Sequence, residues 1–406
     1  MNSIDQEKKW TMRDRVLAVM DGRLPDRLPF IDRIEIWYKG MLARGTMPPA
    51  YEGMSLNQVH KAVGIGRQKF SIPYALKLRG VDMRILFEGE LIHQESDPDV
   101  RYFPAQYPPE EIPRNRPGTS VVEYRTPRGS VSVSYVFAES MISLSGMEPY
   151  LTSHLVKEET DYRIVEYILE RADFVPLYEA FKAEEEAVGA HGLLVPSIHR
   201  IPFQQALLEY LGEMSLFQAL YDSREALDRL IHLLDLQMVN IIERLAETDL
   251  PYIEFGDNLD GMMTNPNLFQ EYCIPEYQKY TGMLHDMGKK AGSHTDGNLK
   301  PLVDLMPESG LDVCESFTPQ PLTELLFEEA WAKWRNGPLI WGGIPSDLLE
   351  ERTDQAVFEM FVENLLATVG RNPIIVGVGD MVLDINRIER VKYIADRIEA
   401  HDLGAF

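Results

Sequence analysis

The second half of the chain alternates short apolar runs with longer segments in which apolar residues recur at helical spacing. Short apolar runs bounded by turn residues are typical of strands buried on both faces, and the periodic segments are typical of amphipathic helices. The expected strands are residues 192–196, 252–255, 290–293, 312–315, 339–342 and 373–378. The expected helices are residues 163–172, 178–188, 203–210, 224–247, 267–287, 322–335 and 355–368. This alternation indicates parallel βαβ units and predicts an α/β fold, a (β/α)8 TIM barrel.

The start of the chain predicts an N-terminal extension that leads into the barrel. Thr11 is a suitable N-cap for a helix whose apolar face carries Val16 and Met20, and Gly22 ends that helix. A turn rich in proline follows, and residues 28–36 are a candidate first strand.

A segment early in the chain has a different texture and predicts an insertion at residues 86–137. Prolines crowd residues 103–117 and exclude a regular helix there. Two candidate strands, 121–125 and 130–137, flank a Thr-Pro-Arg-Gly turn, and the second alternates apolar residues with serines. This pattern is typical of a β-hairpin with one solvated face, so we expect a hairpin that covers part of the barrel.

The composition narrows the class of protein. A length of 406 residues suits one α/β barrel, and since no linker separates two compact units, we expect a single domain over residues 1–406. The only cysteines, Cys273 and Cys314, exclude a disulfide framework and suit a reducing cytosol. The net charge of −24 argues against nucleic acid or an anionic membrane as a partner.

The ends and the hydropathy of the chain bear on its location. Residues 1–10 are polar and charged and lack the apolar core of a signal peptide. No apolar stretch approaches the length needed to span a bilayer. We therefore expect a cytoplasmic protein.

Three carboxylates lie at the end of the apolar strand expected at residues 252–255. Glu254, Asp257 and Asp260 lie within seven residues, and Asn258 lies among them. At a barrel mouth such groups can act as general acids or bases, as metal ligands or as hydrogen-bond acceptors. They can equally cap the next helix, since Asp and Asn do this well. We expect at least one to be functional, with Asp257 as the favoured residue.

A histidine ends the next expected strand. His294 is followed by Asp296, and a His and a carboxylate two residues apart can bind one metal ion. Cys314, near the end of the following strand, is either a thiolate ligand or a small buried residue, and the second role is the commoner one for a free cysteine.

Two further strand ends carry candidate groups. His199 and Arg200 follow the strand expected at residues 192–196 and are candidates to contact substrate, although an arginine more often pairs with a carboxylate. Gly377 and Gly379 allow a sharp turn or a close backbone approach, but they lack the spacing of a dinucleotide-binding motif.

Several short motifs, in order, resemble the uroporphyrinogen decarboxylase superfamily. The opening helix and a P-D-R-hydrophobic-P turn resemble its start, and residues 293–298 resemble the segment that reads H-x-C-G-N in its methyltransferases. The motifs that carry the resemblance lie at residues 11–16, 25–29, 200–203, 256–258, 265–269, 274–277, 293–298 and 342–345. They span nearly the whole chain, and the resemblance implies a TIM barrel.

The resemblance is closer to the corrinoid-dependent methyltransferase branch than to the decarboxylase. The decarboxylase carries an M-R-Q-A-G-R motif after its first strand, and residues 32–37 have none of it. Methyltransferases of this branch hold zinc through His and Cys. His294 matches the first ligand, Asp296 replaces the second, the last falls near Gly379 or Asp380, and we add Cys314 as a candidate ligand.

The resemblance and the substitution at Asp296 together predict a reaction. An oxygen ligand leaves zinc a stronger Lewis acid that suits oxygen more than sulfur. We therefore expect an enzyme that moves methyl from a methoxylated small molecule, expected to be aromatic, to cobalamin (a methylcobamide once loaded) on a corrinoid protein. The expected catalytic residues are Glu254, Asp257 and His294, and the expected substrate-binding residues are His199, Arg200 and Asn258.

Two other functions remain open on the sequence. One is a metal-free decarboxylase or lyase of a carboxylated substrate, in which His294 and Asp296 form an acid/base couple. The other is a non-catalytic binding barrel whose mouth is blocked by the hairpin, although a hairpin there could equally be a lid. Relatives are often dimers, so a homodimer stays open as well.

Overall fold

The computed structural model describes residues 10–104, 108–142, 148–379 and 381–401, and its centre is a closed barrel of eight parallel strands. The strands follow one another around the barrel in the order β1 (Ile31–Asp32), β2 (Gly66–Ser71), β11 (Gly192–Ile198), β12 (Tyr252–Phe255), β13 (Lys290–His294), β14 (Val313–Phe317), β15 (Leu339–Ile344) and β16 (Ile375–Val378). A parallel bridge between Phe30 and Val376 closes the last strand on the first. The predicted (β/α)8 TIM barrel is confirmed.

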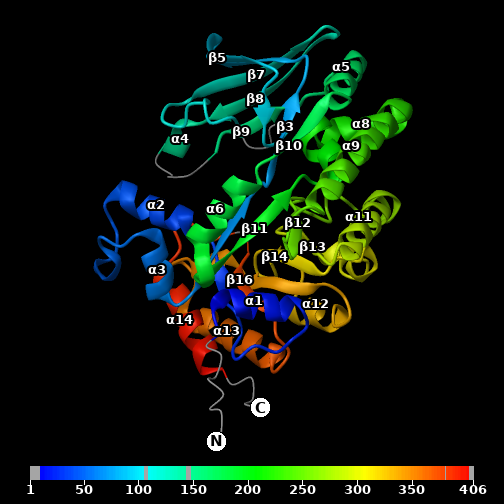
Figure 1. Cartoon of the computed structure of the whole chain (residues 1–406). Helices are drawn as coiled ribbons and strands as arrows, with labels where there is room; N and C mark the ends of the chain where they lie inside the picture. Colours follow the sequence, from blue (N-terminus) through cyan, green and yellow to red (C-terminus); the bar gives the residue numbers. More distant parts are fainter. Residues whose placement is uncertain (1–9, 105–107, 143–147, 380, 402–406) are drawn as a thin grey trace, which may run out of the picture.

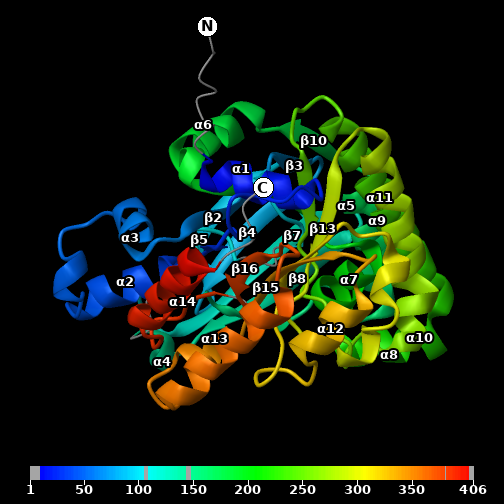
Figure 2. The same cartoon turned by 90° about the horizontal axis from the view of Figure 1, so that it is seen from below.

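Helices surround the barrel (Figure 2). They are α1 (Met12–Met20), α2 (Glu35–Arg44), α3 (Leu56–Val63), α5 (Glu159–Leu169), α6 (Tyr178–Val188), α7 (Pro202–Gln205), α8 (Glu213–Asp222), α9 (Arg224–Leu245), α10 (Pro266–Leu268), α11 (Ile274–Asp286), α12 (Phe327–Lys333), α13 (Gln355–Val369) and α14 (Ile388–Ala400). Two π-helical turns, Ala206–Leu211 and Phe269–Cys273, interrupt the helices after β11 and β12. No helix in the described part of the chain has the length and apolar character to cross a membrane.

Helix α1 closes the amino-terminal end of the barrel. Thr11 caps it, because its side chain accepts from the backbone N–H of Asp14 at 3.1 Å, as the sequence predicts. Val16 and Val19 pack into a buried cluster with side chains of the barrel interior, among them Trp341. The carboxyl ends of the strands are therefore the open side of the barrel, where TIM barrels carry their sites.

An accessory layer of antiparallel strands lies over those carboxyl ends (Figure 1, upper part). One sheet has the order β5 (Glu90–Ser96), β4 (Asp82–Phe87), β7 (Gly118–Thr126), β8 (Gly129–Phe137) and β9 (Tyr150–Ser153), with the short α4 (Glu139–Ile142) after β8. A second has the order β10 (Ala172–Pro176), β3 (Tyr74–Leu78) and β6 (Asp99–Val100). The predicted hairpin is β7 and β8, paired up to Thr126 and Gly129.

The accessory layer is larger than the insertion that the sequence predicts at residues 86–137. The layer begins with β3 and ends with β10. These two strands, which are far apart in the sequence, pair with each other and so enclose the segment between them. Residues 105–107 of the predicted insertion lie outside the described residues.

The second barrel strand, β2, was not predicted, because its sequence lacks an apolar run. Arg67 and Lys69 point outward and form ion pairs with Glu35 and Glu184 at 3.2 and 2.7 Å. The strand therefore looks polar, although its inward residues line the barrel. The first strand is also shorter than the predicted 28–36, because the chain turns after Asp32 and α2 begins at Glu35.

Candidate active site

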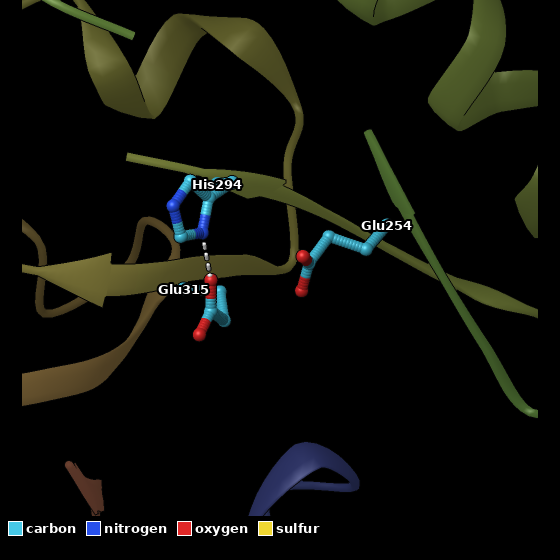
Figure 3. Close-up of side chains that lie close together, drawn as sticks. All are labelled: Glu254, His294 and Glu315. Atoms are coloured by element: carbon cyan, nitrogen blue, oxygen red, sulfur yellow. Dashed lines mark hydrogen bonds and ion pairs between the residues drawn. The ribbon is translucent and has the colours of Figure 1, made fainter. Parts of the chain in front are cut away.

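Three neighbouring strands bring Glu254, His294 and Glu315 together at the carboxyl end of the barrel (Figure 3). One ligand atom from each residue lies within 4.8 Å of the others. The cluster is nearly closed to solvent, with exposed fractions of 1%, 9% and 2%. Such a buried group of two carboxylates and an imidazole is the arrangement expected of a metal or acid/base site.

Strand register and one glycine place these side chains. Glu254 lies opposite Gly292, and His294 lies opposite Glu315. A side chain at position 292 would meet the Tyr252 hydroxyl at 2.0 Å, so glycine leaves room for that ring. The Tyr252 hydroxyl in turn donates to Glu254 at 2.9 Å and orients the carboxylate.

A bulge orients the third member of the cluster. The pairing of β14 with β15 shifts register between Cys314 and Phe317, and Ser316 has a left-handed φ of +61°. Bulges next to active sites re-aim side chains, and a non-glycine residue at positive φ stores local strain. Gln68 on β2 donates to the Glu315 carboxylate at 2.6 Å and fixes it from the other side.

His294 lies between two carboxylates. Its Nδ1 is 2.5 Å from a Glu315 oxygen, and its Nε2 is 3.5 Å from an Asp296 oxygen. Burial alone would lower the pKa of His294, but the charges of Asp296 and Glu315 outweigh it and hold that pKa well above the usual value. Burial would likewise raise the pKa of Asp296, but the imidazolium and the Asn258 amide lower it to about 2.

Glu254 has the opposite balance. Burial and the neighbouring Glu315 charge raise its pKa well above the ordinary value, despite the Tyr252 hydrogen bond. Two carboxylates held this close in a buried site repel each other, and a divalent cation would offset both the repulsion and the burial. The donor set of two carboxylates and one imidazole fits a divalent metal of the zinc type. The residues that could hold a metal are therefore Glu254, His294 and Glu315.

The other predicted ligands lie outside this cluster. Asp296 faces the ring nitrogen of His294 that points away from Glu315 and Glu254 in Figure 3. Cys314 packs in the hydrophobic core, and burial raises the pKa of its thiol. Because side chains alternate along β14, the neighbouring Glu315 points into the cluster instead. Asp380 lies outside the described residues.

Asp257, the favoured functional carboxylate, lies in a different environment. It is fully buried and accepts from Tyr277 and Ser293 hydroxyls at 2.7 Å and from the Ile201 backbone N–H at 2.8 Å. Burial raises its pKa, and these three hydrogen bonds oppose that shift. Asp257 therefore ties β12 to α11, to β13 and to the loop after β11, and the structure does not bring it into the cluster.

Arg200 and Asn258 are linked to His294 through Asp296, and the side chain of each is already engaged. Arg200 is buried, donates to Glu209 at 2.8 Å and to the Asn258 side-chain oxygen at 2.9 Å, and also donates to the Gly256 carbonyl. The Asn258 amide nitrogen donates to both Asp296 oxygens, at 3.1 and 3.2 Å. These contacts form a line that ends at His294.

His199 anchors the accessory layer to the barrel. Its ring lies nearly parallel to those of Tyr102, at a centroid distance of 4.3 Å, and Tyr74, at 5.6 Å, and its Nδ1 is hydrogen-bonded to the Tyr74 hydroxyl. Burial lowers its pKa to about 3, so it is neutral. Its Nε2 is buried and has no hydrogen-bond partner in the described part of the chain.

Several residues near the site were not singled out from the sequence. Phe70 packs edge-on against His294 at 6.0 Å, with Arg33 over its ring at 4.7 Å. Asp32 accepts from the Arg33 backbone at 2.6 Å and from the Val378 backbone, and burial raises its pKa to about 8. Their common feature is a place at the end of a barrel strand, but β1 is too short and β2 too polar for the pattern to show it.

Comparisons with known proteins give a likeness in fold. No protein-family model matches the chain, and no curated protein matches its sequence. Among solved structures, the chain is similar to a methyltransferase from Methanosarcina mazei, with a TM-score of 0.55 and 13% identity over 97% of this chain and 99% of that chain. At this identity the likeness shows that the two chains share a fold across almost their whole lengths.

Proposed function

We propose that the protein is a methyltransferase that moves the methyl group of a methoxylated aromatic molecule to the corrinoid of a partner protein. The observation that carries the proposal is the buried cluster of Glu254, His294 and Glu315 at the open end of the barrel. The shared fold with a solved methyltransferase and the motif resemblance support the same class of reaction.

The proposal assigns zinc to this cluster. Glu254, His294 and Glu315 would hold it, with His294 contributing the Nδ1 edge that faces both carboxylates in Figure 3. Zinc bound there would act as a Lewis acid on the ether oxygen of the methyl donor. An oxygen-rich ligand set suits this task better than thiolates do.

The chain's own residues would bind, orient and exclude water. In the proposed reaction the bond between methyl carbon and ether oxygen would break with the electron pair left on oxygen, and a reduced corrinoid on the partner protein would supply the pair for the new bond to methyl. The near-complete burial of the cluster keeps water from competing. His199, whose Nε2 has no partner among the described residues, remains the proposed substrate contact where the barrel meets the accessory layer.

A metal-free decarboxylase or lyase is the second candidate. The observation that favours it is the imidazole of His294 between Asp296 and Glu315, whose charges keep it protonated. A protonated imidazole in a buried site can deliver a proton to the carbon that loses carbon dioxide. Under this candidate Asp296 and His294 form the acid/base couple.

The test is elemental analysis of the purified full chain, followed by a methyl-transfer assay with methoxybenzoates and free cob(I)alamin as the acceptor. We expect about one zinc per chain in the wild type, because three protein ligands are usual in catalytic zinc sites. His294→Ala should lose the zinc and slow methyl transfer by at least about 10³-fold, as expected when an electrostatic catalyst is removed.

The matched control is His232→Ala, since His232 is exposed on α9. It should keep both zinc and activity. Zinc-free wild type, or a His294→Ala variant with full activity, would overturn the proposal and leave the decarboxylase candidate, for which carbon dioxide release from carboxylated aromatics is the assay.

A further inference from the structure

We propose that Arg200, Asn258 and Asp296 are positioning residues that hold the ring of His294, and that Arg200 and Asn258 do not contact the substrate. The line of contacts runs from Glu209 through Arg200 and Asn258 to Asp296 and then to Nε2 of His294. The inference deepens the proposed function and rests on it only for the identity of the metal.

Asn258 is the residue that makes this line chemically consistent. Arginine has only donors, so the side-chain oxygen of Asn258 must face Arg200, at 2.9 Å. The amide nitrogen must then face Asp296, whose ionised oxygens only accept, at 3.1 and 3.2 Å. An aspartate at position 258 would place two anions against each other, and a lysine or arginine would repel Arg200. The asparagine amide accepts from the cation on one side and donates to the anion on the other.

The backbone under Asn258 is held in an uncommon conformation. Its φ is +49°, in the left-handed region that side chains other than glycine rarely adopt. Arg200 stabilises this turn because it also donates to the carbonyl of Gly256, two residues earlier. Strain of this kind persists only where surrounding contacts determine it, and it clusters at functional sites.

The far end of the line is fixed as well. Arg200 is 3% exposed and its partner Glu209 is 2% exposed, so the ion pair is held in the protein interior. Glu209 lies on the π-helical turn Ala206–Leu211, and such turns are frequent at functional sites. The line of contacts therefore starts at a buried ion pair on the elements that follow β11, and it ends at His294 on β13.

This arrangement matches what a metal-bound histidine requires. A histidine that binds a metal through one nitrogen usually donates its other N–H to a carboxylate, which fixes the ring and its tautomer. Asp296 lies 3.5 Å from Nε2, while Nδ1 faces Glu315 of the three-residue cluster. Asp296 then acts through His294 and not as a ligand.

The first experiment loads the full chain with Co²⁺ in place of zinc and records the visible d–d spectrum. Asn258→Asp should change the spectrum and weaken the metal about 10- to 100-fold, as expected for an outer partner of a ligand. The double variant Asn258→Asp, Asp296→Asn should move both readouts back toward wild type, because the new carboxylate at position 258 accepts both from Arg200 and from the new amide at position 296. Asn372→Asp, at an exposed position, is the matched control.

The second readout separates positioning from substrate contact. Arg200→Lys, which loses the forked guanidinium, should lower kcat about 10- to 100-fold and leave KM for the methoxybenzoate unchanged. Arg371→Lys, at an exposed position, should change neither. A raised KM with an unchanged kcat would overturn the inference, and so would an Asn258→Asp variant with the wild-type cobalt spectrum.

A metal-independent readout keeps the two proposals apart. If wild type takes up no cobalt or zinc, the proposed function fails, and the inference is decided on the Nε2 proton resonance of His294 in ¹⁵N-histidine-labelled protein. A downfield resonance in wild type that is lost in Asn258→Asp and returns in the double variant would support it. The same resonance in all three proteins would overturn it.

Discussion

Glu254 and Asp257 lie three residues apart at the end of the same barrel strand, yet they have opposite surroundings. Asp257 accepts three hydrogen bonds at 2.7 to 2.8 Å, from two hydroxyls and one backbone N–H, and these donors stabilise its ionised form. Glu254 accepts one from Tyr252 and lies near Glu315 in the cluster with His294. We expect the buried carboxylate with three donors to be structural, and the one with a single donor beside a second carboxylate to take up a proton or a metal.

Removing the charges of the cluster should have the largest effect on metal binding. Glu254→Gln with Glu315→Gln should weaken zinc by more than the roughly 10- to 100-fold expected for loss of an outer partner. In the metal-free state Glu254→Gln alone should be at least as stable as wild type, because it removes the charge that repels Glu315 and leaves the pair of Glu315 and His294 intact. Zinc titration and thermal unfolding with chelator measure the two effects.

The control for that variant is Glu351→Gln with Glu389→Gln, both exposed. It should bind zinc as wild type does. Retained zinc in the cluster variant would show that these carboxylates are not the ligands.

Removing the metal tests whether the cluster is the site where it binds. At a free zinc concentration about 100 times the dissociation constant, binding adds about 2.7 kcal/mol to the free energy of unfolding. A chelator should therefore lower the melting temperature of wild type and leave that of the His294→Ala variant unchanged. Differential scanning calorimetry decides this, and an equal shift in both proteins would place the metal elsewhere.

Asp257→Asn tests the structural member of the pair. Its amide would present N–H groups to hydroxyl and backbone donors, so we expect a loss of about 1–3 kcal/mol of unfolding free energy. Zinc content should stay at the wild-type value, because Asp257 lies outside the cluster. Denaturant unfolding and elemental analysis measure the two effects, and Asp286→Asn, at an exposed position, is the control. Loss of zinc with unchanged stability in the Asp257 variant would contradict the prediction.

Cys314→Ala should have the smallest effect. The side chain packs in the core and its thiol is not ionised, so we expect about 1 kcal/mol of destabilisation, typical of a point change in a core. Zinc content should not change. Cys273→Ala, the other buried free cysteine, is the reference for the loss of a core thiol, and zinc lost only from the Cys314 variant would restore that thiol as a ligand.

The barrel and part of its site follow from the sequence because they rest on local pattern. Strands such as Tyr252–Phe255 are short, mostly apolar runs buried on both faces, and this pattern can be recognised without knowledge of the neighbouring strands. The same pattern puts Glu254 and His294 at strand ends, where a TIM barrel carries its chemistry. The hairpin of β7 and β8 was also predicted, from its turn residues and its alternation.

Only the tertiary structure decided which neighbours each polar residue has. Whether Cys314 or Glu315 faces the cluster depends on the register of β14 against β13, which places Glu315 opposite His294, and a shift of one residue would exchange the faces. Asp257 and Glu254 have the same chemistry, and donors from distant elements, Tyr277 and Ile201, give them different surroundings. The sequence by itself determined where carboxylates and imidazoles stand along the strands; register and long-range hydrogen bonds, which no local pattern encodes, determined which of them meet.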